Sequence, residues 1–162
     1  MRAGSDPYNR LYERMIGFHT NFRSSYAFLQ RFLPQSASLG KRDLEVYLSR
    51  AADLCHHLEM HHNIEETYVF PALAKKMPSF ALGDAHVKEH AVMHAALELL
   101  EAYVQQSTPW PKTVYDPEKM GIILTTLGQA LFPHLEAEEE SLKAANMRKA
   151  GWTESEMARL PM

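Results

Sequence analysis

The stretch His61-His62-Asn63-Ile64-Glu65-Glu66 places a histidine and a carboxylate four residues apart, and His134-Leu135-Glu136-Ala137-Glu138-Glu139 repeats this spacing near the C-terminus. On an α-helix, residues four apart lie on the same face, one turn above the other. If both stretches are helical, each offers a nitrogen and an oxygen ligand from one face. Both stretches therefore predict a metal-binding turn.

Apolar residues recur at intervals of three and four around these stretches, which is typical of amphipathic helices. The first helix is expected from Asp6, its N-cap, and Pro7 to about Leu33, and the second from Gly40 until Pro71 bends or ends it. A third helix is expected to start at Asp84 and to end within residues 107–111. A fourth starts at Asp116-Pro117 and runs to about Met147.

A single domain over residues 1–162 is expected, with a bundle core at about 7–147. Thr153 and Glu156 form a capping-box pattern that predicts a short C-terminal helix at about 153–160. Four long helices with short connections favour an all-α, antiparallel up-down four-helix bundle. At about 1.5 Å per residue, the chain returns to about one level at each candidate histidine. All four helices can thus present ligands in one layer.

Composition excludes several classes of partner. The net charge of −3 gives no electrostatic reason to bind nucleic acid or an anionic membrane. No stretch reaches the roughly 18 apolar residues of a membrane helix, and the N-terminus lacks the apolar core of a signal peptide. The single cysteine, Cys55, cannot form an intramolecular disulfide. We expect a cytoplasmic protein; its oligomeric state is open.

Histidine is the anomaly of the composition, with nine residues that cluster instead of scattering. His90 follows His19 by 71 residues, while His134 and Glu138 follow His61 and Glu65 by 73, so the halves of the chain resemble two copies of one pattern. The candidate metal ligands are His19, His61, Glu65, His90, His94, His134 and Glu138.

Five imidazoles and two carboxylates are too many ligands for one ion and suit two, with each carboxylate able to bridge. Nitrogen and carboxylate together favour iron, zinc, manganese or copper over calcium or magnesium. If His90, His94 and His134 hold one ion, the other has only His19 and His61 as nitrogen ligands. That second ion keeps an open position where O2 or a substrate binds.

Other interpretations of the same residues stay open. His57, and His62 with Glu66 one step round the helix, are alternative ligands, although supporting or surface roles suit them better. Glu59-x-x-His62 matches a ferritin-like motif, but that architecture needs two such motifs and only one is present. His86-x-x-Glu89-His90 matches an inverted zinc-protease motif, but a metallopeptidase would leave the remaining histidines unexplained.

Over roughly residues 10–147 the chain resembles the hemerythrin-like (HHE cation-binding) family. The likeness lies in His19, His61-x-x-x-Glu65-Glu66 running into Val69-Phe70-Pro71, Glu89-His90-x-x-Met93-His94, and His134-x-x-x-Glu138-Glu139. It implies a four-helix bundle holding two iron ions, oxo- or hydroxo-bridged, with terminal histidines and bridging carboxylates. Invertebrate oxygen carriers of the family have His-x-x-x-x-Asp in the fourth helix, so Glu138 and Glu139 both remain candidate ligands.

The resemblance implies reversible O2 binding or O2-linked redox chemistry. The leading hypothesis is a di-iron protein that binds O2. The alternatives are a non-haem di-iron oxygenase or oxidase acting on a small organic molecule, and an iron or O2 sensor or store. No catalytic residue is predicted, and whether the protein is an enzyme stays open at this point.

Overall fold

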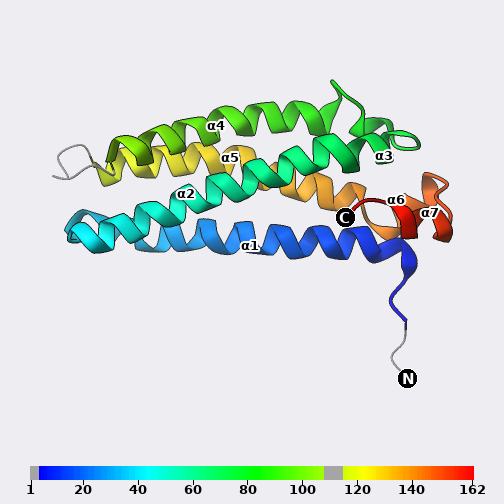
Figure 1. Ribbon diagram of the computed structural model, residues 1–162, viewed down its shortest axis with the longest axis horizontal. Helices are drawn as coiled ribbons and strands as arrows, with labels where there is room; N and C mark the ends of the chain where they lie inside the picture. Colours follow the sequence, from blue (N-terminus) through cyan, green and yellow to red (C-terminus); the bar gives the residue numbers. More distant parts are fainter. Residues whose placement is uncertain (1–3, 108–114) are drawn as a thin grey trace.

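A computed structural model describes residues 4–107 and 115–162. In these residues the chain is helical and has no strand, which confirms the all-helical prediction. Four of the described helices are long: α1 (Arg10–Phe32), α2 (Lys41–Ile64), α4 (Ala85–Ser107) and α5 (Pro117–Ser141) (Figure 1). The predicted end of the third helix falls partly at residues 108–111, outside the described residues.

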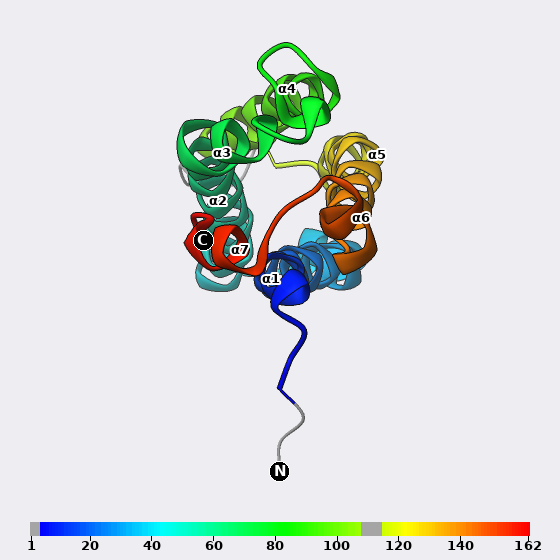
Figure 2. The same cartoon turned by 90° about the vertical axis from the view of Figure 1, so that its right-hand side faces the viewer.

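The four long helices pack around a common interior (Figures 1 and 2). α1 contacts α2 and α5, and α4 contacts the same two helices, so the contacts close a ring. The apolar residues that recur at intervals of three and four form the core. In α1, for example, Phe22, Tyr26 and Leu29 are buried in it. None of the described helices is long and apolar enough to cross a membrane.

The predicted helix starts are present. The Asp6 side chain accepts a hydrogen bond from the Tyr8 backbone N–H at 3.0 Å and so caps a 3-10 turn, Pro7–Asn9, that leads into α1. Asp116 caps α5 in the same way through the N–H of Glu118, at 2.9 Å. Thr153 and Glu156 make the reciprocal bonds of a capping box at α7 (Glu154–Arg159).

The end of the second helix contains a wide turn. α2 passes into a π-helical turn, Glu65–Val69, and then into the short helix α3 (Phe70–Ala74). Pro71 stands in the first turn of α3, where its missing N–H is tolerated. Such π turns occur frequently at functional sites, and this one begins at a candidate ligand, Glu65.

The fourth helix is shorter than predicted. α5 stops at Ser141, and the chain turns at Leu142 before α6 (Ala144–Lys149). The prediction of one helix to about Met147 was wrong because no proline or glycine marks the break. Tertiary packing makes it instead, since Leu142 and Met147 are both buried in an apolar cluster at the end of the bundle.

That end cluster is closed by the C-terminal segment. Met157 and Leu160 pack in it with Leu11 of α1. Arg10 holds the segment through hydrogen bonds from its guanidinium to the carbonyls of Met157 and Leu160, each at 3.2 Å, and of Met162, at 2.6 Å. The molecule thus has two apolar clusters, and the candidate ligands occupy the helical turns between them.

Candidate metal centre

Six of the seven predicted ligands meet in the interior between the two apolar clusters. Two groups of ligand atoms form, and the atoms of each lie within 4.8 Å of one another: His19, His61, Glu65 and Glu138 in the first, and Glu65, His90, His134 and Glu138 in the second. Each of the four long helices supplies a histidine. Both carboxylates belong to both groups, which is the arrangement expected of ligands shared by two ions.

The Glu65 carboxylate faces His61, one helical turn earlier in the sequence, and His90 on the neighbouring helix α4. Its Oε1 contacts Nε2 of His61, four residues earlier, and its Oε2 lies 3.0 Å from Nε2 of His90 on α4. The Glu65 side chain is 0% exposed. The i, i+4 spacing of the sequence supplies the first contact, and helix packing supplies the second.

Glu138 repeats this arrangement from α5. Its Oε2 lies 3.0 Å from Nε2 of His134, four residues earlier, and its Oε1 lies 3.4 Å from Nε2 of His19 on α1. Glu138 is also 0% exposed. The two carboxylates therefore stand in equivalent positions in the two halves of the chain.

Most of these facing atoms have no hydrogen-bond partner, although they are buried. The unpartnered atoms at the centre are Nε2 of His19, His61 and His62 and both carboxylate oxygens of Glu65 and Glu138. Leaving a buried polar atom unpaired costs about 1–3 kcal/mol, and more for a charged group. A cation between the nitrogens and oxygens would satisfy all of them, so the donor set fits a metal.

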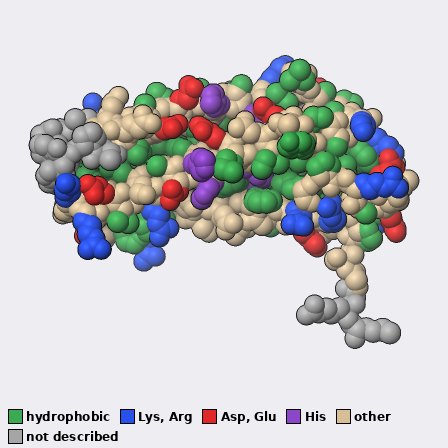
Figure 3. Space-filling model, in the orientation of Figure 1, with side chains coloured by type: hydrophobic (Ala, Val, Ile, Leu, Met, Phe, Trp, Pro, Cys, Tyr) green, Lys and Arg blue, Asp and Glu red, His purple; other side chains and the backbone are tan. Residues whose placement is uncertain are grey.

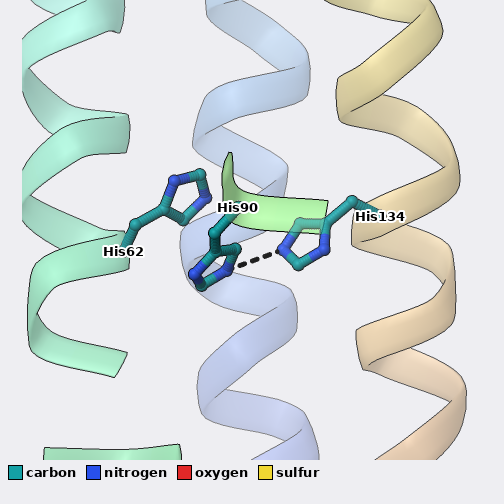
Figure 4. A group of neighbouring side chains, drawn as sticks. All are labelled: His62, His90 and His134. Atoms are coloured by element: carbon teal, nitrogen blue, oxygen red, sulfur yellow. Dashed lines mark hydrogen bonds between the residues drawn. The ribbon is translucent and has the colours of Figure 1, made fainter. Parts of the chain in front are cut away.

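His62 joins the cluster as a fifth buried imidazole (Figure 4). Its ring stacks on that of His90 with centroids 4.0 Å apart, and Nε2 of His90 lies 3.1 Å from Nε2 of His134. The ligand atoms of these three histidines also lie within 4.8 Å of one another. The sequence offered His62 only as an alternative ligand.

His94, the remaining predicted ligand, lies outside the cluster. Its side chain is 61% exposed, and its Nε2 pairs with Glu98 at 3.0 Å. The reason is the rotation of α4: Met93 takes the inward position, and His94, the next residue, points about 100° away from it round the helix. His57, another alternative ligand, is also exposed.

Three carboxylates contact the outward nitrogens of three clustered histidines. Nδ1 of His19 lies 2.8 Å from Glu139, Nδ1 of His90 lies 3.0 Å from Glu66, and Nδ1 of His134 lies 2.6 Å from Glu89. A carboxylate in this position fixes the ring and its tautomer, so that Nε2 faces the metal.

Glu138 and Glu139 make different contacts. Glu138 faces the cluster, whereas Glu139 contacts His19 from outside and pairs with the Arg23 guanidinium at 2.7 and 3.0 Å. Glu65 and Glu66 divide the two roles in the same way. The duplicated Glu-Glu pair was the sequence signal for Glu139 and Glu66, whereas Glu89 appeared only as part of the motifs around His90 and was not predicted to contact His134.

The histidines of α2 and α5 have pKa values shifted in opposite directions. Desolvation lowers the pKa of His61 to about 4 and that of His62 to about 2, so both rings are neutral and can donate a lone pair at neutral pH. For His134, burial is outweighed by the carboxylates of Glu138 and Glu89, which raise its pKa to about 9. Burial, together with the nearby Glu138, raises the pKa of Glu65.

His86 lies beside the centre without facing it. Its Nε2 is 3.1 Å from the Ser141 hydroxyl, and its Nδ1 is 3.8 Å from Glu89. His86, Glu89 and His134 also form a group with ligand atoms within 4.8 Å. His86 and His90 both belong to the motif that resembles that of inverted zinc proteases. Only His90 lies among the ligand atoms around Glu65 and Glu138, whereas His86 contacts Ser141.

Two clefts reach the cluster from opposite sides of α2. One, of about 470 Å³, lies between α2 and α4 and is lined in part by Glu59, His62, Glu66, His90 and His94. The other, of about 250 Å³, lies between α1 and α2 and is lined in part by Phe18, Phe22, Met60, His61 and Ile64. The first is acidic and rich in histidine, and the second is largely apolar.

The chain matches a known protein family. The profile of the Hemerythrin HHE cation binding domain matches residues 10–145, which include all the clustered histidines and carboxylates. No curated protein and no solved structure matches the chain.

Proposed function

Since the chain belongs to the hemerythrin HHE cation-binding family, we propose that the buried cluster is a non-haem di-iron centre that binds O2 within an antiparallel up-down four-helix bundle. One observation carries the proposal: two groups of buried ligand atoms share Glu65 and Glu138, whose oxygens have no hydrogen-bond partner. Nitrogen and carboxylate ligands suit iron among the transition metals. The family resemblance favours iron among the metals that such ligands accept.

The two halves of the centre are unequal. His62, His90 and His134 would hold one iron, and His19 and His61 the other, with Glu65 and Glu138 shared. The fifth nitrogen is thus assigned to His62 in place of His94. An iron held by His19 and His61 would have one nitrogen ligand fewer than the other, and we propose that O2 binds on this side.

The surroundings of His61 suit a small neutral ligand. Phe18 and Phe22 each lie with their ring centroids 5.2 Å from that of His61, and the apolar cleft opens beside them. Two ferrous ions, when bound, supply the electrons for binding O2. The aromatic side chains give this side of His61 an apolar surface, while Glu139 and Glu89 orient His19 and His134.

The second candidate is a di-iron oxygenase or oxidase acting on a small organic molecule. The apolar cleft favours it, because about 250 Å³ beside His61 is enough space for a compact apolar substrate. The same ligands would serve, so only the fate of O2 separates the two functions.

The test is to load the metal-free protein anaerobically with Fe(II), admit O2 and follow the visible spectrum. A new absorption band that disappears when O2 is removed, and returns on its readmission, supports reversible binding. A band that decays, and decays faster with a mixture of small apolar molecules, supports the oxygenase. Protein that takes up one zinc ion and no iron would overturn the di-iron proposal.

A further inference from the structure

The carboxylates at the centre have no exposed surface, so a metal ion must pass through the protein to reach them. Glu65 and Glu138 are 0% exposed, and His62 is 7% exposed. A divalent cation sheds bound water on this path, and losing that water without replacement ligands is expensive. The entry route should therefore offer oxygen or nitrogen ligands along its length.

The cleft between α2 and α4 offers such ligands. Its lining includes the carboxylates of Glu59 and Glu66 and the imidazole of His94, and no Lys or Arg among the described residues that line it. Figure 3 shows acidic and histidine side chains gathered at mid-length over these two helices. This lining attracts cations, because low-dielectric walls concentrate the field of the carboxylates.

The ligands of this cleft run from the surface to the centre. His94 pairs with Glu98 where both side chains are mostly exposed. Glu66 is 42% exposed, yet its Oε1 lies 3.0 Å from Nδ1 of His90. Next to it, His62 lines the cleft, and its buried Nε2 has no hydrogen-bond partner.

The apolar cleft lacks these features. Phe18, Phe22, Met60 and Ile64 line it, and none of its described lining residues is Asp or Glu. Its polar lining residues, Asn21, Ser25, His57 and His61, can bind a cation but carry no negative charge that would attract one. The two clefts therefore differ in the charge of what they can admit.

We propose that the cleft between α2 and α4 is the entry route for divalent cations, with Glu59, Glu66 and His94 as transient ligands and His62 as the first buried ligand. This inference rests on the proposed two-ion centre, because it concerns how that centre is filled. It assigns His94 a role at the surface, where the structure places it.

The test is the rate at which the full, metal-free chain takes up Co2+, followed by stopped-flow absorption. Glu59→Lys should lower the second-order rate constant by about tenfold or more, since charges lining a cleft change association rates by 10- to 1,000-fold. His94→Leu should lower it by a smaller factor. Both variants should still bind as many Co2+ ions at equilibrium as the unaltered protein.

Glu45→Lys is the matched control. It makes the same charge change on the same helix, 14 residues or roughly 21 Å from Glu59, and should leave the rate constant nearly unchanged. Equal rate constants for Glu59→Lys and Glu45→Lys would overturn the route. Circular dichroism checks that both variants are folded.

A second measurement needs no variant. Uptake by the unaltered protein should slow as salt is raised, because salt screens the attraction of the cleft for the ion. A rate constant that does not change with salt would contradict the route. If the unaltered chain binds no Co2+, the centre and its route fail together; if it binds Co2+ normally but Glu59→Lys is not slowed, only the route fails.

Discussion

His61 and His62 are neighbours in the sequence, but they open onto two different clefts. His61 lies against Phe18 and Phe22 between α1 and α2, whereas His62 lies against His90 between α2 and α4. Consecutive helical residues point about 100° apart, so one helix can form a wall of both clefts. Through these two adjacent histidines, α2 gives the centre an apolar side and an acidic side.

This difference connects the two proposals. The acidic side suits the arrival of a metal cation, and the apolar side suits O2 or a small organic molecule. Glu65 lies in the π-helical turn that continues α2, the helix of both histidines, and belongs to both groups of ligands. Four predictions test how separate the two sides are.

The largest effect is expected from Glu65→Gln, because both sides depend on this carboxylate. Replacing a shared oxygen ligand with a neutral amide should reduce the bound metal from about two ions to at most one per chain. Metal analysis after equilibrium loading with Fe(II) or Co2+ measures this number. Glu45→Gln, an exposed change on the same helix, should keep both ions; retention of both ions by Glu65→Gln would show that the carboxylate is not shared.

His62→Leu and His94→Leu form a pair that tests the acidic side. The second half of the chain already has leucine at the position equivalent to His62, Leu135. His62→Leu should weaken binding of one Co2+ ion by at least about tenfold, the lower limit for losing even a residue that only supports a ligand. His94→Leu should leave the equilibrium affinity unchanged. If a Co2+ titration showed weaker binding for His94→Leu and unchanged binding for His62→Leu, His94 and not His62 would be the fifth nitrogen ligand.

The protonation of the centre should also differ between α2 and α5. At neutral pH, His61 and His62 are neutral, whereas the raised pKa of His134, about 9, means that this ring carries a proton which a metal must displace. Metal affinity should therefore rise with pH between 7 and 9, by up to about tenfold per pH unit for one proton released.

Co2+ titrations at pH 7, 8 and 9, with an indicator dye for proton release, measure this dependence. Glu89→Gln should flatten it, since the Glu89 carboxylate helps to raise the pKa of His134. An affinity that does not change over this pH range in the unaltered protein would contradict the protonated His134.

The smallest effect is expected from a larger side chain in the apolar cleft beside His61. Ile64 is partly exposed and lines the cleft beside His61, so Ile64→Trp should narrow it. The reaction of the Fe(II)-loaded protein with O2 should slow severalfold, while Co2+ uptake keeps its rate. Stopped-flow absorption measures both rates, and an equal slowing of the two would show that the clefts are not separate routes.

Much of the fold could be predicted because its signals are local. Asp6, Asp116 and Thr153 cap their helices as expected, since capping depends on a few adjacent residues. The break at Leu142 could not be predicted, because it depends on burial against residues far away in the chain. The wide turn at Glu65–Val69 likewise has no local signal beyond the nearby Pro71.

The helices, the level at which their histidines meet and the i, i+4 pairs His61/Glu65 and His134/Glu138 all follow from local sequence, because rise and spacing along a helix are fixed by backbone geometry. Tertiary packing selects which side chains turn inward: on α2 His62 does, on α4 His94 does not, and of the adjacent pair Glu138 does while Glu139 does not. The reason is rotation about each helix axis. Packing sets that rotation, and a difference of one residue, about 100°, moves a side chain from a supporting or surface position into the centre.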